Sequence, residues 1–280
     1  MKSFEGFLTE ERMERLDYEV RVQRLNSLVA QIGEKYRRGN EKVKPLPVDA
    51  SCRIMMDSFM QVYEKEEVGA DIDIVKNKEK QWWEEGRERN FGSIGEQFEL
   101  LKTAIFNKYL GDRFIVVRSA LYDDYKNGVD NVMVDIKTGN VVCAFDEVGD
   151  AAAFKRQKEQ RVSARNLEEG GASLKYGIKF EDGKLKPARL QNLPIFCLSL
   201  SEEEVKRGIS EMEFSSGKKS PVEDEIFRIC LTELQAQITT LEGNLPEMIS
   251  GANTEKAAKL KNLSGHLALF KESILNLEIQ

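Results

Sequence analysis

Apolar residues recur at helical spacing near the N-terminus of the chain. They alternate in steps of four and three, which predicts a helix with a heptad-like stripe. The stripe consists of Tyr18, Val22, Leu25, Val29, Ile32 and Tyr36. Gly39 and Asn40 form a stop signal, and Pro45 and Pro47 indicate an extended connector. Residues 49–90 again have a helical pattern but are rich in charge.

The C-terminal part of the chain carries two further helical stripes. The first contains Phe227, Leu231, Leu234, Ile238, Leu241 and Leu245, and the second contains Leu260, Leu263, Leu267, Phe270, Ile274 and Leu277. Gly243, Pro246 and Gly251 lie between them, which predicts two antiparallel helices joined by a loop. These stripes either pack within the chain or form an intermolecular coiled coil, which would make the protein a homodimer.

The middle of the chain mixes helical and strand-like patterns. Its predicted elements are a helix over 94–110, strands over 114–118, 129–136 and 141–148, a polar helix over 151–168, a strand over 195–200 and a helix opening at Ser201. The order α-β-β-β-α-β-α predicts a mixed sheet with helices on its faces. We therefore expect an α/β (α+β) core over 91–215, between an N-terminal helical region over 1–90 and a C-terminal helical hairpin over 216–280.

Composition is typical of a folded, well-solvated protein. Of the 280 residues, 32% are charged and 41% are hydrophobic, and the formal net charge is −6. An acidic chain does not attract nucleic acid by bulk charge, so DNA or RNA would need a local basic patch. No apolar run approaches 18 residues and the first residues lack the apolar core of a leader. We therefore expect a cytoplasmic protein without a membrane span.

Cysteine and histidine usage argues against two kinds of site. Cys52, Cys143, Cys197 and Cys230 are far apart in the chain, and His266 is the single histidine. A zinc site of the usual kind needs closer spacing, so buried thiols are the expected state. A histidine-dependent triad would have to use His266, which lies in a helical segment.

Acidic residues stand at the ends of the predicted central strands. Asp130 enters the second strand, and Asp146 and Glu147 lie near the end of the third. Glu99 lies on the preceding helix. Carboxylates gathered at one sheet edge repel one another unless a cation lies between them. Mg²⁺, or Mn²⁺ in its place, takes such oxygen ligands, which predicts a metal site at this edge.

Each acid also has an ordinary structural interpretation. Glu96 follows Ser93 at capping-box spacing and is expected to cap the helix. Glu99 points either to the site or to solvent, Asp130 is either functional or caps a turn, and Asp146 and Glu147 are either ligands or solvated strand-end acids. The pair Asp123 and Asp124 is expected to form a solvated turn.

Four features of the middle region follow one another: a helix with Gly95-Glu-Gln-Phe-Glu99, the Gly128-Val-Asp130 motif, the turn after the second strand, and the acidic third strand. Together they resemble the PD-(D/E)XK nuclease superfamily, in particular its Mrr-like restriction-endonuclease branch. The resemblance covers about 91–200. It implies a restriction-endonuclease-like fold in which Asp130 and the third-strand acid hold the metal and Glu99 assists. It also implies a lysine, two residues after that acid, that helps to activate water.

The sequence departs from this pattern at the lysine. The position is Val148 if Asp146 is the third-strand acid, and Gly149 if Glu147 is. Lys155 and Lys158, on the following helix, are the candidates to replace it.

These two lysines belong to a basic run with Arg156 and Arg161. The run either binds the phosphates of DNA or RNA or forms a solvated helix face. Two hypotheses follow: a metal-dependent nuclease that hydrolyses phosphodiester bonds, or a non-catalytic scaffold with a degenerate nuclease fold and coiled-coil-type helices.

Overall fold

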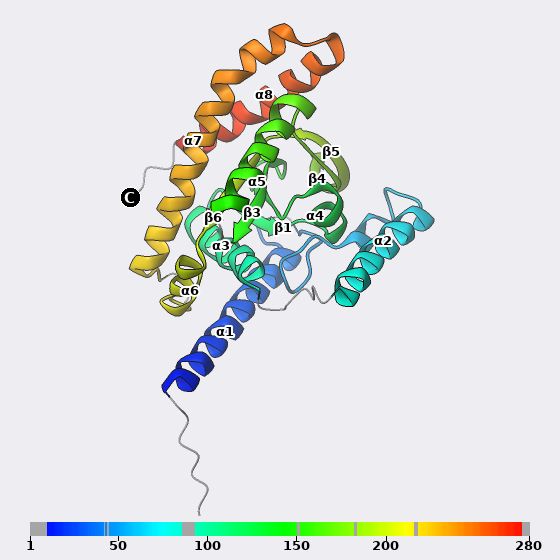
Figure 1. The fold of residues 1–280 in the computed structure, drawn as a ribbon. Helices are drawn as coiled ribbons and strands as arrows, with labels where there is room; N and C mark the ends of the chain where they lie inside the picture. The colour runs from blue at the N-terminus through cyan, green and yellow to red at the C-terminus, as the bar shows by residue number, and fades with distance from the viewer. Residues whose placement is uncertain are drawn as a thin grey trace, which may run out of the picture.

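The computed structural model describes residues 10–41, 43, 45–85, 93–149, 152–181, 184–215 and 218–275. Its fold is mixed α/β (Figure 1). The helices are α1 (Glu10–Arg38), η1 (Met56–Phe59), α2 (Lys65–Glu84), α3 (Ile94–Leu110), α4 (Leu121–Asn127), α5 (Ala152–Ala164), η2 (Arg165–Glu169), α6 (Glu202–Ser210), α7 (Pro221–Gly251) and α8 (Thr254–Leu275). The strands are β1 (Phe114–Arg118), β2 (Asn131–Asp135), β3 (Val141–Gly149), β4 (Ala172–Glu181), β5 (Lys184–Leu193) and β6 (Ile195–Leu200).

The central sheet has the strand order β1-β2-β3-β6. The pairs β1–β2 and β2–β3 are antiparallel, and β3 runs parallel to β6. A short turn joins β2 to β3 and the helix α4 lies between β1 and β2, whereas the parallel pair needs the long crossover that contains α5. The predicted mixed sheet with flanking helices is therefore confirmed.

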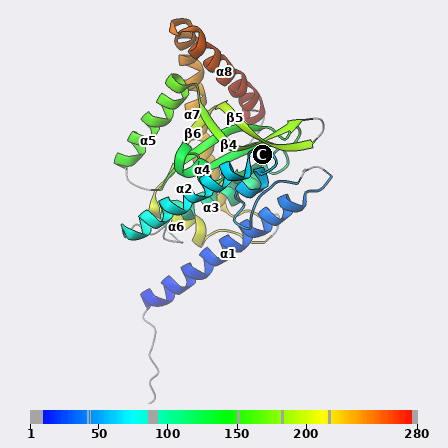
Figure 2. The same cartoon turned by 90° about the vertical axis from the view of Figure 1, so that its right-hand side faces the viewer.

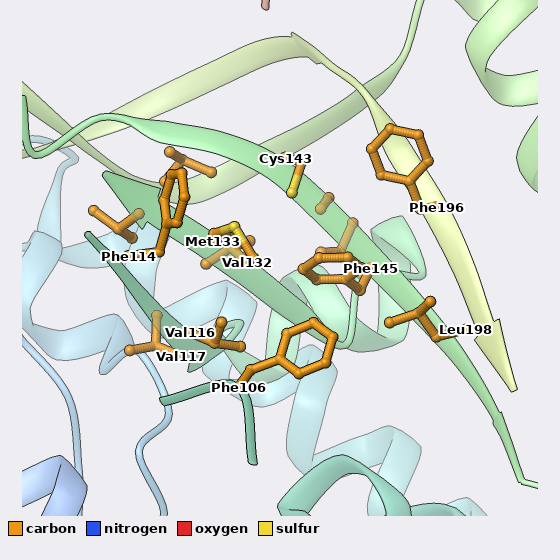
Figure 3. Packing of buried hydrophobic residues seen from close by; sticks show 14 of the residues in the cluster. Phe106, Phe114, Val116, Val117, Val132, Met133, Cys143, Phe145, Phe196 and Leu198 are labelled. Carbon is orange, nitrogen blue, oxygen red and sulfur yellow. The ribbon is translucent and has the colours of Figure 1, made fainter. Parts of the chain in front are cut away.

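The core between α3 and this sheet is aromatic and aliphatic (Figure 3). Phe106 of α3 lies edge-on to Phe145 of β3, with ring centroids 6.0 Å apart, and edge-on to Phe227 of α7 at 5.7 Å. The burial of β1 is complete, as expected for an apolar strand covered on both faces. This packing fixes the strand ends that carry the acidic residues.

A second sheet of two strands, β4 and β5, was not predicted from the sequence. Glycine, proline and several lysines interrupt the apolar pattern of this hairpin. Tyr176 of β4 nevertheless lies fully buried, edge-on to Phe59 and with its hydroxyl donating to Asp71 of α2 at 2.6 Å. The hairpin is thus held by tertiary contacts with the N-terminal segment.

The heptad stripe of α1 packs inside the protein. Leu25 and Val29 are buried, the hydroxyl of Tyr18 donates to Gln97, and that of Tyr36 donates to Asn107 at 2.6 Å. The contacts of this stripe therefore lie within the chain, as one of the two interpretations expected.

The helices α7 and α8 lie side by side (Figures 1 and 2). The residues of both stripes are buried up to Ile274, whereas Leu277 lies outside the described residues. Phe227, at the start of the first stripe, packs on Phe106 and Tyr109 of α3. The predicted loop is displaced: α7 runs through Gly243 and Pro246 and ends at Gly251. Leu241 and Leu245, on either side of Gly243, are buried, so packing outweighs the local preference of glycine and proline to end a helix. Among the described residues, none of the helices combines the length and the apolarity that crossing a bilayer requires.

Candidate functional site

Asp130 is fixed by the backbone on both sides. The helix α4 ends at Gly128, whose φ of +53° is the left-handed conformation that glycine adopts readily. The Asp130 N–H then donates to the Phe145 carbonyl at 2.9 Å, and its own carbonyl accepts from Ser119 at 3.0 Å. Its carboxylate accepts from the Glu147 N–H at 2.7 Å. Asp130 is therefore tied to β3, where the other acids lie.

Asp146 and Glu147 are consecutive residues of β3 and have different partners. The Asp146 carboxylate accepts from Arg161 of α5 at 3.0 Å and pairs with Lys158 of the same helix at 2.5 Å. Glu147 instead faces Lys102 of α3 and Asn131 of β2. Because successive side chains of a strand point to opposite faces, the two acids cannot serve one centre equally. The structure brings Asp146, rather than Glu147, to α5.

Lys158 joins the two aspartates. Its Nζ lies 2.5 Å from Asp146 Oδ1 and 3.9 Å from Asp130 Oδ2, and it also donates to the Glu147 carbonyl. Burial alone would lower the pKa of Lys158, but the two aspartates outweigh burial and raise it. Lys158 is therefore a cation at neutral pH. We call Asp130, Asp146 and Lys158 the carboxylate–lysine trio.

Burial has the opposite effect on Asp130. It raises the pKa of this carboxyl well above the usual value, and the charges of Glu99 and Asp124 act in the same direction. Lys158 opposes them. The trio thus contains a carboxylate whose negative charge is costly unless a cation is close.

Lys102 is a residue of this region that sequence reasoning missed. It is 1% exposed, pairs with the buried Glu147 and lies over the Phe145 ring at 4.4 Å. Burial lowers the pKa of Lys102 to about 7, against the attraction of Asp130. Its signal in the sequence was a lysine among the apolar residues of the predicted 94–110 helix.

Glu99 pairs with two arginines, although its charge still acts on Asp130. Arg118 of β1 donates to its carboxylate at 2.7 Å and 3.1 Å, and Arg53 lies 3.6 Å away. The prediction left Glu99 either at the site or in solvent, and the structure places it in a partly buried ion-pair cluster. Ser93 caps this helix, since its hydroxyl accepts from the Glu96 N–H at 3.3 Å, and the Glu96 carboxylate lies 3.8 Å from Arg118.

The predicted basic run divides between several environments. Lys155 turns to α7, where it pairs with Glu233 at 2.5 Å. Arg156 is exposed. Lys158 belongs to the trio, and Arg161, whose side chain is 59% exposed, contacts Asp146. Of the two lysines proposed to replace the missing one, Lys158 is therefore in position and Lys155 is not.

The trio offers a divalent cation two carboxylates. Among the described residues, no three His, Cys, Asp or Glu side chains form a group that could hold a metal ion. Mg²⁺ typically needs only one or two carboxylates, together with waters and a substrate phosphate. Asp130 and Asp146 both lie within 3.9 Å of the Lys158 ammonium, so they already share one positive charge.

Asp123 departs from its predicted place in a solvated turn. It lies in α4, is fully buried, and accepts from the backbone N–H groups of Lys175 and Tyr176 at 2.8 Å and 2.9 Å. The turn interpretation failed because the β4–β5 hairpin that covers Asp123 was not foreseen.

The four cysteines are buried and free, as expected. Burial raises the pKa of the Cys52, Cys197 and Cys230 thiols to about 12, so they are not activated nucleophiles.

Comparison of the chain with protein-family models, with curated proteins and with solved structures gave no match.

Proposed function

We propose that this protein hydrolyses phosphodiester bonds of DNA or RNA with the help of Mg²⁺ or Mn²⁺, at a restriction-endonuclease-like core. The observation that carries the proposal is the carboxylate–lysine trio. Asp130 immediately precedes β2, Asp146 lies in β3 and Lys158 lies in the following helix, yet both carboxylates lie within 3.9 Å of one Nζ. The central elements follow one another as α3-β1-α4-β2-β3-α5, and the β4–β5 hairpin precedes β6. This order supports the resemblance that the sequence suggested, although α4 and the hairpin were not part of it.

Asp130 and Asp146 are the residues that would hold the metal. When bound, the ion would polarise a phosphoryl oxygen and lower the pKa of a water molecule. The Glu147 N–H orients the Asp130 carboxylate, and Lys102 keeps Glu147 in place behind it.

Lys158 supplies a fixed positive charge beside the reacting phosphate. As a cation it cannot accept a proton from water, so its role is to stabilise negative charge that develops on the phosphoryl group. Arg161 is better suited to contact the substrate, because its guanidinium is exposed and matches the geometry of a phosphate.

The test is cleavage of labelled single-stranded and double-stranded DNA and RNA by the purified chain, with Mg²⁺, with Mn²⁺ and with a chelator. We expect metal-dependent cleavage that Asp130→Asn and Asp146→Asn abolish and Lys158→Met strongly reduces. Lys155→Met is the matched control, because this lysine lies on the same helix but pairs with Glu233. Thermal unfolding of each variant shows whether it is folded. Wild-type protein that cleaves none of these substrates, or an active folded Asp130→Asn protein, would contradict the proposal.

A second candidate function is a non-catalytic scaffold. It is favoured by the ion pairs of the site, since Asp146 has both Lys158 and Arg161, Glu147 has Lys102, and Glu99 has Arg118. Carboxylates that are neutralised by the protein itself need no metal. This candidate predicts no cleavage and an unfolding temperature that Mg²⁺ leaves unchanged, whereas a metal that binds the folded state raises it.

A further inference from the structure

The helix α1 has two apolar faces. One contains Tyr18, Val22, Leu25 and Val29 and packs on the protein. The other contains Met13, Leu16 and Val20, whose side chains are 53%, 44% and 45% exposed. With about 100° per residue, the two faces lie on roughly opposite sides of the helix. We call Met13, Leu16 and Val20 the outer stripe.

The outer stripe lies in the N-terminal half of α1, and this end of the helix projects from the body of the protein (Figures 1 and 2). Beyond Val20 the same side of the helix carries Arg24, Ser27 and Gln31, which line a polar groove with residues 213–215. The apolar residues therefore end where the helix reaches the protein's own surface. Isolated exposed apolar side chains are ordinary, but three in steps of three and four form a surface for another helix.

We propose that the outer stripe binds the outer stripe of a second copy of this chain, in a short parallel two-helix coil over residues 12–24. Met13 and Val20 then occupy positions a of a heptad, and Leu16 occupies position d. This arrangement also leaves the packed face of each α1 turned outward, toward its own body.

Charge complementarity identifies the partner as a second copy. With this heptad, Arg12 and Glu19 occupy positions g, and Asp17 and Arg24 occupy positions e. In a parallel coil each g residue faces the e residue five positions later in the other helix. Arg12 then faces the partner's Asp17, and Glu19 faces the partner's Arg24, so that every flanking pair has opposite charges.

The parallel orientation follows from the same residues. An antiparallel pairing of the same layers would place Asp17 opposite the partner's Asp17 and Glu19 opposite the partner's Glu19, which repel each other. The existing partners of these acids, Arg21 for Asp17 at 3.5 Å and Arg15 for Glu19 at 3.1 Å, are exposed pairs along the same helix. Such pairs are weak and exchange readily for contacts across an interface.

A cysteine at position 16 tests the interface directly. In a parallel coil, both Leu16 residues lie in one layer, so Leu16→Cys joins two full-length chains by a disulfide under mild oxidation. The four native cysteines are buried, which keeps the background low. Glu14→Cys, on another side of the projecting turns, is the control and should remain monomeric. Equal crosslinking of both variants, or none, would overturn the proposal.

Sedimentation equilibrium of the full chain provides the second test. We expect a monomer–dimer equilibrium that shifts to dimer with concentration, and Leu16→Glu should abolish the dimer while the chain stays folded. Asp17→Arg should weaken it, and the exchanged pair Arg12→Asp with Asp17→Arg should restore it. A wild-type protein that is monomeric up to its solubility limit would refute the interface, and this outcome is independent of whether the protein cleaves nucleic acid.

Discussion

The ammonium of Lys102 and the carboxylate of Glu147 form an ion pair that is almost completely shielded from water, with side chains 0% and 2% exposed. Asn131 donates to the same carboxylate at 3.3 Å, and the Thr103 hydroxyl donates to Asn131 at 3.0 Å. The pair connects α3 to β3, and Asn131 extends this connection to β2. Its two members depend on each other, because a single buried charge is much more costly than a buried pair.

Lys102→Met should therefore lower the free energy of unfolding by about 3–5 kcal/mol, because it leaves Glu147 charged and buried. The double variant Lys102→Met with Glu147→Gln should recover most of the lost unfolding free energy. The side-chain amide of the new glutamine is uncharged and still offers an oxygen acceptor to Asn131. Urea unfolding of the four proteins of this double-mutant cycle measures the coupling. Additive effects of the two changes would show that the pair is not formed.

Two glycines should respond to alanine in opposite ways. At Gly171, where φ is +101°, a Cβ atom would lie 2.6 Å from the Leu193 carbonyl oxygen and 2.9 Å from a backbone carbon of Asn192. Both the backbone conformation and the contact disfavour a side chain, so Gly171→Ala should cost about 1–3 kcal/mol. Gly243, within α7, has open space around it.

Gly243→Ala should stabilise the protein by about 1 kcal/mol or somewhat less, because alanine is the better helix former. Thermal and urea unfolding of both variants check the contrast. Destabilisation by Gly243→Ala would argue against a continuous α7 at this position.

The buried carboxyl of Asp123 should make stability depend on acid pH. Burial raises the pKa of Asp123 from 3.8 to about 6, although backbone N–H groups of Lys175 and Tyr176 oppose the shift. Between these values the folded state binds the proton more tightly than the unfolded state. The resulting stability is full below about pH 4 and is lost as the pH rises through about 6, a change of about 3 kcal/mol.

Asp123→Asn has no such titration and serves as the reference for this prediction. The difference in unfolding free energy between wild type and Asp123→Asn should therefore fall from pH 4 to pH 7. Urea unfolding across this range measures it, and a constant or rising difference would show that Asp123 is not protonated in the folded state near pH 5.

The sequence indicated elements whose patterns are local and continuous. The helix over 94–110 and the strands over 114–118 and 195–200 were predicted with the bounds that the structure has. The helix has apolar residues at helical spacing and the two strands are short, nearly continuous apolar runs, so tertiary contacts reinforce the local preference. The β4–β5 hairpin and the course of α7 through Pro246 depend on contacts with distant residues, such as Asp71 with Tyr176, which no local pattern contains.

The site was predictable in part for a similar reason. Strand order brought Asp130 and Asp146 together, because adjacent strands end at one edge of the sheet. The choice between Lys155 and Lys158 needed the position of α7, since Glu233 takes Lys155. Glu147 pairs with Lys102 because its side chain points to the face of β3 that α3 covers. The sequence could not predict which face this is, because β3 carries apolar residues on both faces.

Arg161 is the residue that should control access of a metal ion to Asp146. It binds Asp146 Oδ2 at 3.0 Å and its side chain is 59% exposed, whereas Lys158 on the other oxygen is 24% exposed. Arg161→Gln frees one carboxylate oxygen and should cost less than about 1 kcal/mol of stability, because solvent screens the pair. Arg161→Gln should therefore increase the rise in unfolding temperature that Mg²⁺ or Mn²⁺ causes.

If Arg161 also holds the substrate phosphate, the same variant should cleave nucleic acid more slowly despite binding metal more tightly. Arg156→Gln, an exposed change on the same helix, should alter neither property, and an Arg161→Gln protein with the metal response of the wild type would show that Arg161 does not compete with the ion.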